Sequence, residues 1–307
     1  MKGAIIVNAY SKSESYLYQA RRLKEEFAAA GVRADIIKNR CGIAYIGADG
    51  EIILGFRADF AVFLDKDKYL MRLLERSGMR LFNRAQAIEL CDDKMGTHIA
   101  LQGCGIPMPA SVPAPLCYTP DAPLPEGYLS AVVRALGLPV VVKNSYGSLG
   151  GGVWLAETEG ELAETDSRLR CEPHFYQSFV GESRGRDLRV MAVGGRAVAA
   201  MERISETDFR SNAALGGRCV PVPVPAEAER AAETVSERLG LDFCGIDFLF
   251  GSRGLVLCEV NSNAFFFSLE RVTGVNVAGA YVRHILAEMS RAACGPAPVS
   301  HTNMIKM

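Results

Sequence analysis

The sequence lacks the patterns that mark several large classes of protein. No apolar run approaches the roughly 20 residues that a membrane-spanning helix needs. Its 34 basic and 35 acidic residues give a formal net charge of −1, so no strong overall field favours nucleic acid or an anionic membrane. The first apolar run is too short for a signal peptide and is typical of a buried strand. We therefore expect a cytoplasmic protein whose partners include neither nucleic acid nor a membrane.

Cysteine and histidine form no pattern that carries chemistry. The nine cysteines are scattered and odd in number, and neither a CxxC pair nor a Cys/His metal spacing occurs. The four histidines have no spacing typical of a catalytic triad or a zinc site. We expect reduced thiols that are mostly buried as small apolar groups. Any catalytic site must then use other side chains.

The chain is long enough, at 307 residues, for two modest domains, and 49% of it is hydrophobic. Strands and helices alternate over residues 1–84, which predicts an α/β domain with a mostly parallel sheet. Helical patterns follow at 85–103, 128–136, 227–239 and 277–290, and a proline-rich stretch at 105–127 predicts a loop. The whole is of the α/β (α+β) class.

A glycine-rich loop between two strands is the first candidate site. The run VVVKNSYGSLGGGVWL places Lys143 at the end of an apolar strand and Gly147–Gly152 before the next strand. Glycines let backbone N–H groups approach phosphate oxygens, and the lysine can point at the same phosphates. The loop is neither a Walker A nor a Rossmann fingerprint. A flexible hairpin tip is an equally good interpretation of this run alone.

Two further polar segments are weaker signals. The strand HFYQSFV runs into a polar, basic loop that ends at Arg189, and its exposed edge could offer backbone donors and acceptors to a purine ring. The segment ETDFRSN carries Arg210 and Asn212, whose donors suit phosphate or carboxylate. Alone, each is more simply a solvated loop or turn.

A late hairpin carries three oxygen donors. GIDFLF and LCEVNSN are separated by GSRG, a turn signal, and hold Asp247, Glu259 and Asn261. Because Glu259 and Asn261 are two residues apart, strand alternation places them on one face, and Asp247 can reach that face from the partner strand. Carboxylate and amide oxygens suit Mg²⁺ that bridges nucleotide phosphates. We favour a metal site over a hairpin whose polar side merely faces water.

The order of these motifs resembles the ATP-grasp superfamily and, within it, the RimK-like branch of carboxylate–amine ligases. The resemblance covers roughly residues 85–290 and includes DDKMGTHIALQGCGIPMP, VVVKNSYGSLGGGVWLAE, GRDLRVMAVGGRAVAAMERI, DFRSNAALGG and GIDFLF…LCEVNSN. It implies two α+β subdomains that clamp ATP, with a lid at about 105–178 and a core at about 179–290. Residues 1–84 would form a pre-ATP-grasp domain, and 291–307 a tail.

The resemblance also implies a mechanism. A carboxylate takes the terminal phosphate of ATP, and an amine then displaces phosphate to form an amide, with ADP and phosphate released. Two Mg²⁺ or Mn²⁺ ions would be held by Asp247, Glu259 and Asn261, and Arg210 and Asn212 would stabilise the transferring group. The residues implied to bind the nucleotide are Lys94, Lys143, Ser145, Gly147, Ser148, Gly150, Gly151, Ser178, Phe179, Val180 and Asp187.

One departure from the family concerns the acceptor. Relatives usually follow the EVN motif with a small, flexible Ser/Ala-Pro-Gly stretch, whereas this chain has Phe265, Phe266 and Phe267. We therefore hypothesise that this run lines or narrows the acceptor site. The substrates would be a small-molecule or peptide carboxylate and an amine, and the sequence is compatible with a homo-oligomer. The alternatives are an ATP-grasp small-molecule kinase and a nucleotide-binding regulatory protein without ligase activity.

Overall fold

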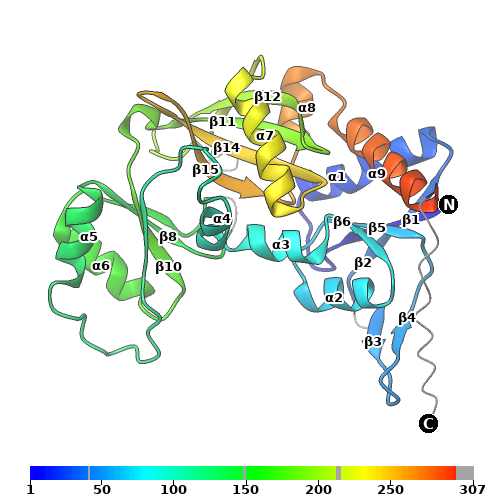
Figure 1. The fold of residues 1–307 in the computed structure, drawn as a ribbon, viewed down its shortest axis with the longest axis horizontal. Coiled ribbons are helices and arrows are strands. Elements are labelled where there is room, and N and C mark those ends of the chain that lie inside the picture. Colours follow the sequence, from blue (N-terminus) through cyan, green and yellow to red (C-terminus); the bar gives the residue numbers. More distant parts are fainter. Residues whose placement is uncertain (41, 148–149, 212–215, 295–307) are drawn as a thin grey trace, which may run out of the picture.

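The protein is described by a computed structural model that covers residues 1–40, 42–147, 150–211 and 216–294. It is a mixed α+β molecule with three main sheets arranged along its longest axis, as Figure 1 shows. No helix in these ranges combines the length and apolar character needed to cross a membrane.

The amino-terminal sheet is parallel, as the alternation of strands and helices predicts. Its strand order is β2-β1-β5-β6. Helix α1 packs on the face that carries Ile5 and Val7, and α2 packs on the face that carries Ala4 and Ile6. Both faces are therefore apolar, as expected for a parallel sheet covered on two sides. The elements are β1 (Lys2–Val7), α1 (Glu14–Ala29), β2 (Arg33–Lys38), β5 (Phe60–Phe63), α2 (Lys68–Arg76) and β6 (Arg80–Phe82), with the hairpin β3 (Ala44–Ile46) and β4 (Ile52–Leu54) beside them.

A smaller antiparallel sheet, at the left of Figure 1, forms the second unit. Its order is β7-β10-β8-β9, and two helices cover one side of it through a separate apolar cluster. Its elements are β7 (Ser111–Pro113), α5 (Tyr128–Leu136), β8 (Val140–Asn144), β9 (Val153–Ala156), α6 (Glu159–Leu169) and β10 (His174–Ser178).

The central sheet is antiparallel, with the order β13-β12-β11-β14-β15. One face packs on α7, and the face that carries Met191 and Met201 packs on α1, α8 and α9. Gly194 and Gly195, with φ of 56° and 78°, make the tight turn between β11 and β12. The elements are the short helix η1 (Gly181–Ser183), β11 (Arg186–Val193), β12 (Arg196–Ile204), β13 (Arg218–Val222), α7 (Ala226–Leu239), β14 (Phe243–Gly251), β15 (Gly254–Asn261), α8 (Phe267–Thr273) and α9 (Val277–Cys294).

Three expected elements differ from the structure. The single helix expected over 85–103 is broken into α3 (Ala85–Asp92) and α4 (Lys94–Ala100), because Asp93 has an extended backbone and its side chain caps α4 by accepting from the backbone N–H of Gly96 at 2.9 Å. The basic loop expected up to Arg189 is shorter, because β11 already begins at Arg186, as the strand pattern of DLRVMAVG also predicts. The last helix continues to Cys294, past the expected limit at 290.

Buried Asn83 ties the amino-terminal unit to the central sheet. Its Nδ2 donates to the carbonyls of Phe243 (2.7 Å) and Ser262 (2.8 Å). Its Oδ1 accepts from the backbone N–H groups of Asp242 (2.7 Å) and Phe243 (2.9 Å). Four backbone groups therefore depend on one side chain that is 1% exposed.

We predict that Asn83→Ala lowers the free energy of unfolding by about 3 kcal/mol, because it leaves buried donors and acceptors unpaired. Urea titration followed by circular dichroism measures this change. Gln102→Ala, which removes an exposed side chain, is the matched control and should be nearly neutral. An equal effect of the two substitutions would show that Asn83 does not hold the units together.

Candidate active site

Two neighbouring cavities lie beside the central sheet. The first, of about 100 Å³, lies between the small antiparallel sheet and the central sheet. The second, of about 460 Å³, lies between the central sheet and α1. Arg203 and Glu259 line both, so these side chains stand at the boundary between the two spaces.

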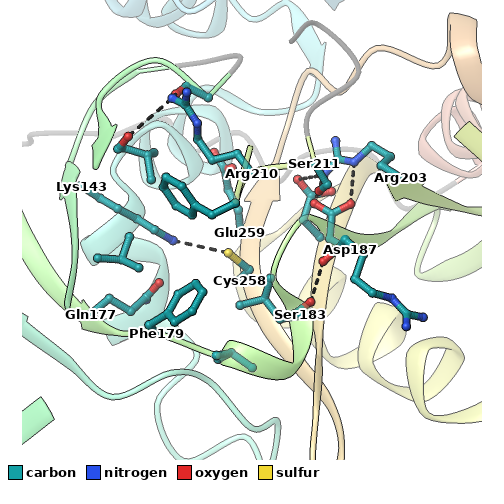
Figure 2. A pocket seen from close by; sticks show the side chains of 18 of the residues that line it. Lys143, Gln177, Phe179, Ser183, Asp187, Arg203, Arg210, Ser211, Cys258 and Glu259 are labelled. Carbon is teal, nitrogen blue, oxygen red and sulfur yellow. Dashed lines mark hydrogen bonds and ion pairs between the residues drawn. The ribbon is translucent and has the colours of Figure 1, made fainter. Parts of the chain in front are cut away.

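The first cavity brings together most of the residues singled out from the sequence. It is lined by residues from the glycine loop, the end of β10, and strands β11, β14 and β15 (Figure 2). The predicted residues that line it are Lys94, Lys143, Gly150, Gly151, Ser178, Phe179, Val180, Asp187, Arg210, Asp247 and Glu259.

The remaining predicted residues lie elsewhere. Asn261 lines the second cavity and not the first. Ser145 is buried below the loop, where its carbonyl accepts from the Lys94 backbone N–H at 2.9 Å. Gly147 is in contact with the site through its carbonyl oxygen, which accepts from Lys94 Nζ. Ser148 and Asn212 lie outside the described residues.

Two lysines converge on the cavity from different elements. Lys94 is in the first turn of α4, because the cap at Asp93 starts a new helix there, and its Nζ lies 2.9 Å from the Gly147 carbonyl and 3.6 Å from Glu259 Oε1. Lys143 comes from β8, and its Nζ lies 3.4 Å from Cys258 Sγ. Figure 2 marks this contact with a dashed line. Both side chains are nearly buried, so water screens their positive charges only weakly inside the cavity.

Arg210 contacts the glycine loop from the opposite side. Its Nη1 donates to the Gly150 carbonyl at 2.7 Å, and its Nε and Nη2 hold Asp208. The hydrogen bond from Arg210, together with its charge, lowers the pKa of Asp208. Asp208 thus orients the guanidinium group while Nη1 points at the loop.

A buried charge cluster underlies the boundary between the cavities. Arg203, 3% exposed, holds Asp187 in a two-pronged pair and lies 3.1 Å from Asp247 Oδ2. Arg189 holds the same Asp247 through bonds of 2.7 and 2.6 Å. Burial, the largest single effect, raises the pKa of Asp247, but the charges and hydrogen bonds of the two arginines outweigh it and bring the pKa to about 2. Asp247 is therefore ionised at neutral pH.

The oxygen donors on the hairpin lie together as the sequence predicts. Asp247 and Glu259 are direct cross-strand partners, and Asn261 Nδ2 lies 3.5 Å from Asp247 Oδ2. Among the described residues, no three His, Cys, Asp or Glu side chains gather closely enough to hold a metal ion by themselves. The donor set fits a hard cation in its chemistry, with an ionised carboxylate, a second carboxylate and an amide oxygen. Arg189 and Arg203 already bond to both carboxylate oxygens of Asp247, so Glu259 and Asn261 are the more available metal ligands.

An apolar slot opens at the end of β10. Phe179 and Phe209 meet edge to face, with ring centroids 6.4 Å apart, and Val141 and Leu249 complete the lining. A flat base fits such a surface, because stacking and burial act on any aromatic ring. Ser178 and Val180 also line the cavity here, at the end of β10 and just beyond it.

Sequence reasoning missed Arg203, Arg189, Cys258 and Ser211 as residues of the two cavities. A signal was present for Arg203, because it follows Met201 by two residues and so lies on the same face of the strand as this apolar side chain. A charged residue on a buried strand face requires a partner. The partner becomes evident only once the register between β11 and β12 is known, since Asp187 lies directly opposite Arg203.

Comparison with known proteins assigns the family. The model of the RimK-like ATP-grasp domain matches residues 124–285. The chain is 36% identical over 295 residues to a probable alpha-L-glutamate ligase of Xanthomonas oryzae pv. oryzae, a match that spans 91% of this chain and 97% of that one. The chain belongs to the RimK-like ATP-grasp family. The predicted resemblance is thereby confirmed.

Other relatives share only part of their length with this RimK-like chain. It is 39% identical over 221 residues to beta-citrylglutamate synthase B of Homo sapiens, and 38% identical over 221 residues to human N-acetylaspartylglutamate synthase A. These matches span 70% of this chain but only 55% and 54% of those proteins. The chain thus spans about half the length of these curated relatives.

Solved structures confirm the predicted ATP-grasp fold. A RimK domain protein of Sphaerobacter thermophilus has a TM-score of 0.67 at 22% identity and covers 93% of this chain and 100% of its own. D-alanine–D-alanine ligase of Bacillus anthracis has a TM-score of 0.70 at 16% identity, with 95% and 98% covered. At these identities the likeness concerns the fold alone.

We predict that Arg203→Met lowers the free energy of unfolding by about 3–5 kcal/mol, because it leaves the carboxylate of Asp187 buried without its main partner. Adding Asp187→Asn should recover part of this loss by removing the stranded charge. Arg196→Met, on an exposed position of the same strand, is the control. Thermal and urea unfolding measure all four proteins, and a double variant no more stable than Arg203→Met would contradict the pairing.

Proposed function

We propose that this protein is an ATP-dependent carboxylate–amine ligase that forms an amide bond and releases ADP and phosphate. The arrangement of the two cavities is the observation that carries the proposal. The nucleotide would bind at the first cavity, where Lys94 and Lys143 converge, and a second substrate would bind at the larger adjoining cavity on the other side of Glu259 and Arg203. The reacting groups would then meet at the boundary, as transfer of a phosphoryl group requires.

The names of the relatives agree with this reaction class. Several curated relatives are named as synthases or as a probable ligase, and the solved D-alanine–D-alanine ligase was obtained in complex with ATP. The ATP-grasp ligase PsnB, with a TM-score of 0.68 at 16% identity, was solved with a minimal precursor, Mg and ADP. For this chain we accordingly propose ATP as the nucleotide, Mg²⁺ or Mn²⁺ as the metal, and small-molecule or peptide substrates.

The chemistry proceeds in two displacements. An oxygen of the substrate carboxylate attacks the γ-phosphorus, the bond to the bridging oxygen breaks, and ADP leaves. The amine nitrogen then attacks the acyl carbon of the resulting acyl phosphate, phosphate leaves with the C–O electron pair, and the nitrogen loses a proton to solvent. Neither step needs a nucleophilic side chain, so positioning and charge neutralisation carry the catalysis.

We assign the cationic side chains to the phosphates. Lys94 and Lys143 would contact the α- and β-phosphates, and Arg210 would meet the transferring group. Lys94 and Arg210 presently hold carbonyl oxygens of Gly147 and Gly150. A phosphate oxygen is the stronger partner for a cation than a neutral carbonyl, so a nucleotide competes effectively for both side chains.

Magnesium bound by Glu259, Asn261 and Asp247 would neutralise charge on the phosphates. Asp247 is already ionised, so it needs to lose no proton before it binds a metal ion. The expected domain limits, the cytoplasmic location and a homo-oligomeric state stay predictions.

The reaction class is tested by incubating the purified protein with ATP, Mg²⁺ and paired carboxylates and amines. We expect ADP release only when both partners are present, together with a product mass equal to the two partners minus water. A stable phosphorylated product would favour the kinase alternative. ATP binding without any turnover across the panel would favour a regulatory nucleotide-binding protein.

We predict that Glu259→Gln lowers kcat roughly a hundredfold or more. A neutral amide binds the proposed Mg²⁺ more weakly than a carboxylate does, and the charge of the phosphates is then less well neutralised. The melting temperature should stay close to that of the parent, since Glu259 is one-quarter exposed and lies at the cavity wall. Glu237→Gln on the exposed side of α7 is the control for loss of a carboxylate. Unchanged turnover in Glu259→Gln would remove the hairpin from the proposed metal site.

A further inference from the structure

The second cavity has two chemically different sides. The side next to the first cavity is formed by the central sheet and carries Arg189, Arg203, Glu259 and Asn261. The opposite side is formed by α1, the end of β5 and the segment 263–268. The apolar side chains of that opposite side, which we call the aromatic wall, are Tyr16, Leu64, Ala264, Phe265 and Phe267.

Several polar groups beside the aromatic wall already have partners in the protein. Asp65 accepts from Asn8 Nδ2 at 3.0 Å and from Asn39, and its carbonyl accepts from Asn263 Nδ2 at 2.8 Å. Gln19 Nε2 donates to the Ala264 carbonyl. The Lys66 ammonium pairs with Asp92. A second carboxylate placed on this side would lie near Asp65, whose negative charge disfavours it.

The phenylalanines that face the cavity are held rigidly. Phe265 meets Tyr16 edge to face at 6.3 Å, and Phe267 meets Tyr18 edge to face at 4.9 Å. Phe266 between them is fully buried against Phe243, so the hypothesis that all three line the acceptor site is wrong for Phe266. Its burial anchors the segment and leaves Phe265 and Phe267 partly exposed on the cavity side.

We propose that Phe265 and Phe267 select a carboxylate substrate that bears one reacting carboxylate and an apolar group on the opposite end. This inference rests on the proposed ligase function, names its substrate class, and assigns the two rings to the carboxylate substrate in place of the amine acceptor suggested by the sequence. The carboxylate lies beside Arg189 and Glu259, near the phosphates, and the apolar group lies against the aromatic wall. Burial of each additional methylene in such a pocket is worth roughly tenfold or more in kcat/KM.

Hydroxylamine as the amine tests this without knowledge of the natural acceptor, because it converts an acyl phosphate to a hydroxamate that can be measured by colour. The probes are N-acetylglycine, N-acetyl-L-leucine, N-acetyl-L-phenylalanine and N-acetyl-L-aspartate. We expect kcat/KM for the leucine and phenylalanine derivatives to exceed that for the glycine and aspartate derivatives at least about tenfold.

Two substitutions at one position separate apolar character from the fold. Phe267→Leu keeps an apolar side chain and should retain the preference, whereas Phe267→Asn should lower kcat/KM for the leucine probe about tenfold and leave the KM for ATP unchanged. Equal rates for all four acids, or a preference for the aspartate derivative, would overturn the substrate class while the ligase function stands. No hydroxamate from any acid would overturn both.

Discussion

The pairing of Arg203 with Asp187 and Asp247 is the interaction on which the site depends. All three side chains lie on the same face of the central sheet, at its end nearest the small sheet, and all are nearly buried. Isolated charges in such a place would be very costly, and their mutual hydrogen bonds offset most of that cost. The arrangement fixes the ionised state of Asp247 and places a guanidinium group at the boundary of both cavities.

The glycine loop is also held by cationic side chains. Lys94 and Arg210 hold its carbonyls, although they lie 116 residues apart in the sequence. Neither contact is a strong ion pair, so the loop is held by bonds that a phosphate can replace at little cost. Under the proposed function, a nucleotide would replace these bonds and take the same two cations as partners.

Sequence reasoning succeeded where the signal was local and failed where it depended on register. The β14–β15 hairpin, the C-terminal end of α7 at Gly240 and the lysine before the glycine loop were all predictable from turn residues, periodicity and spacing. The charge cluster was not, because Arg189 and Arg203 acquire meaning only from the carboxylates opposite them on neighbouring strands. The break at Asp93 was missed because a capping side chain competed with an otherwise helical pattern.

The burial of Phe266 shows why three identical residues in a row have different roles. The segment after β15 leaves the sheet with alternating exposure, so Ala264 and Phe266 are buried while Phe265 and Phe267 are not. Phe266 is fixed by the same apolar cluster that joins α1, α8 and the central sheet. The rings of Phe265 and Phe267, on either side of it, therefore face α1, where they meet Tyr16 and Tyr18. A binding surface formed by rigid aromatic rings loses little conformational entropy when a ligand is bound, which favours selection by shape and apolar contact over selection by charge.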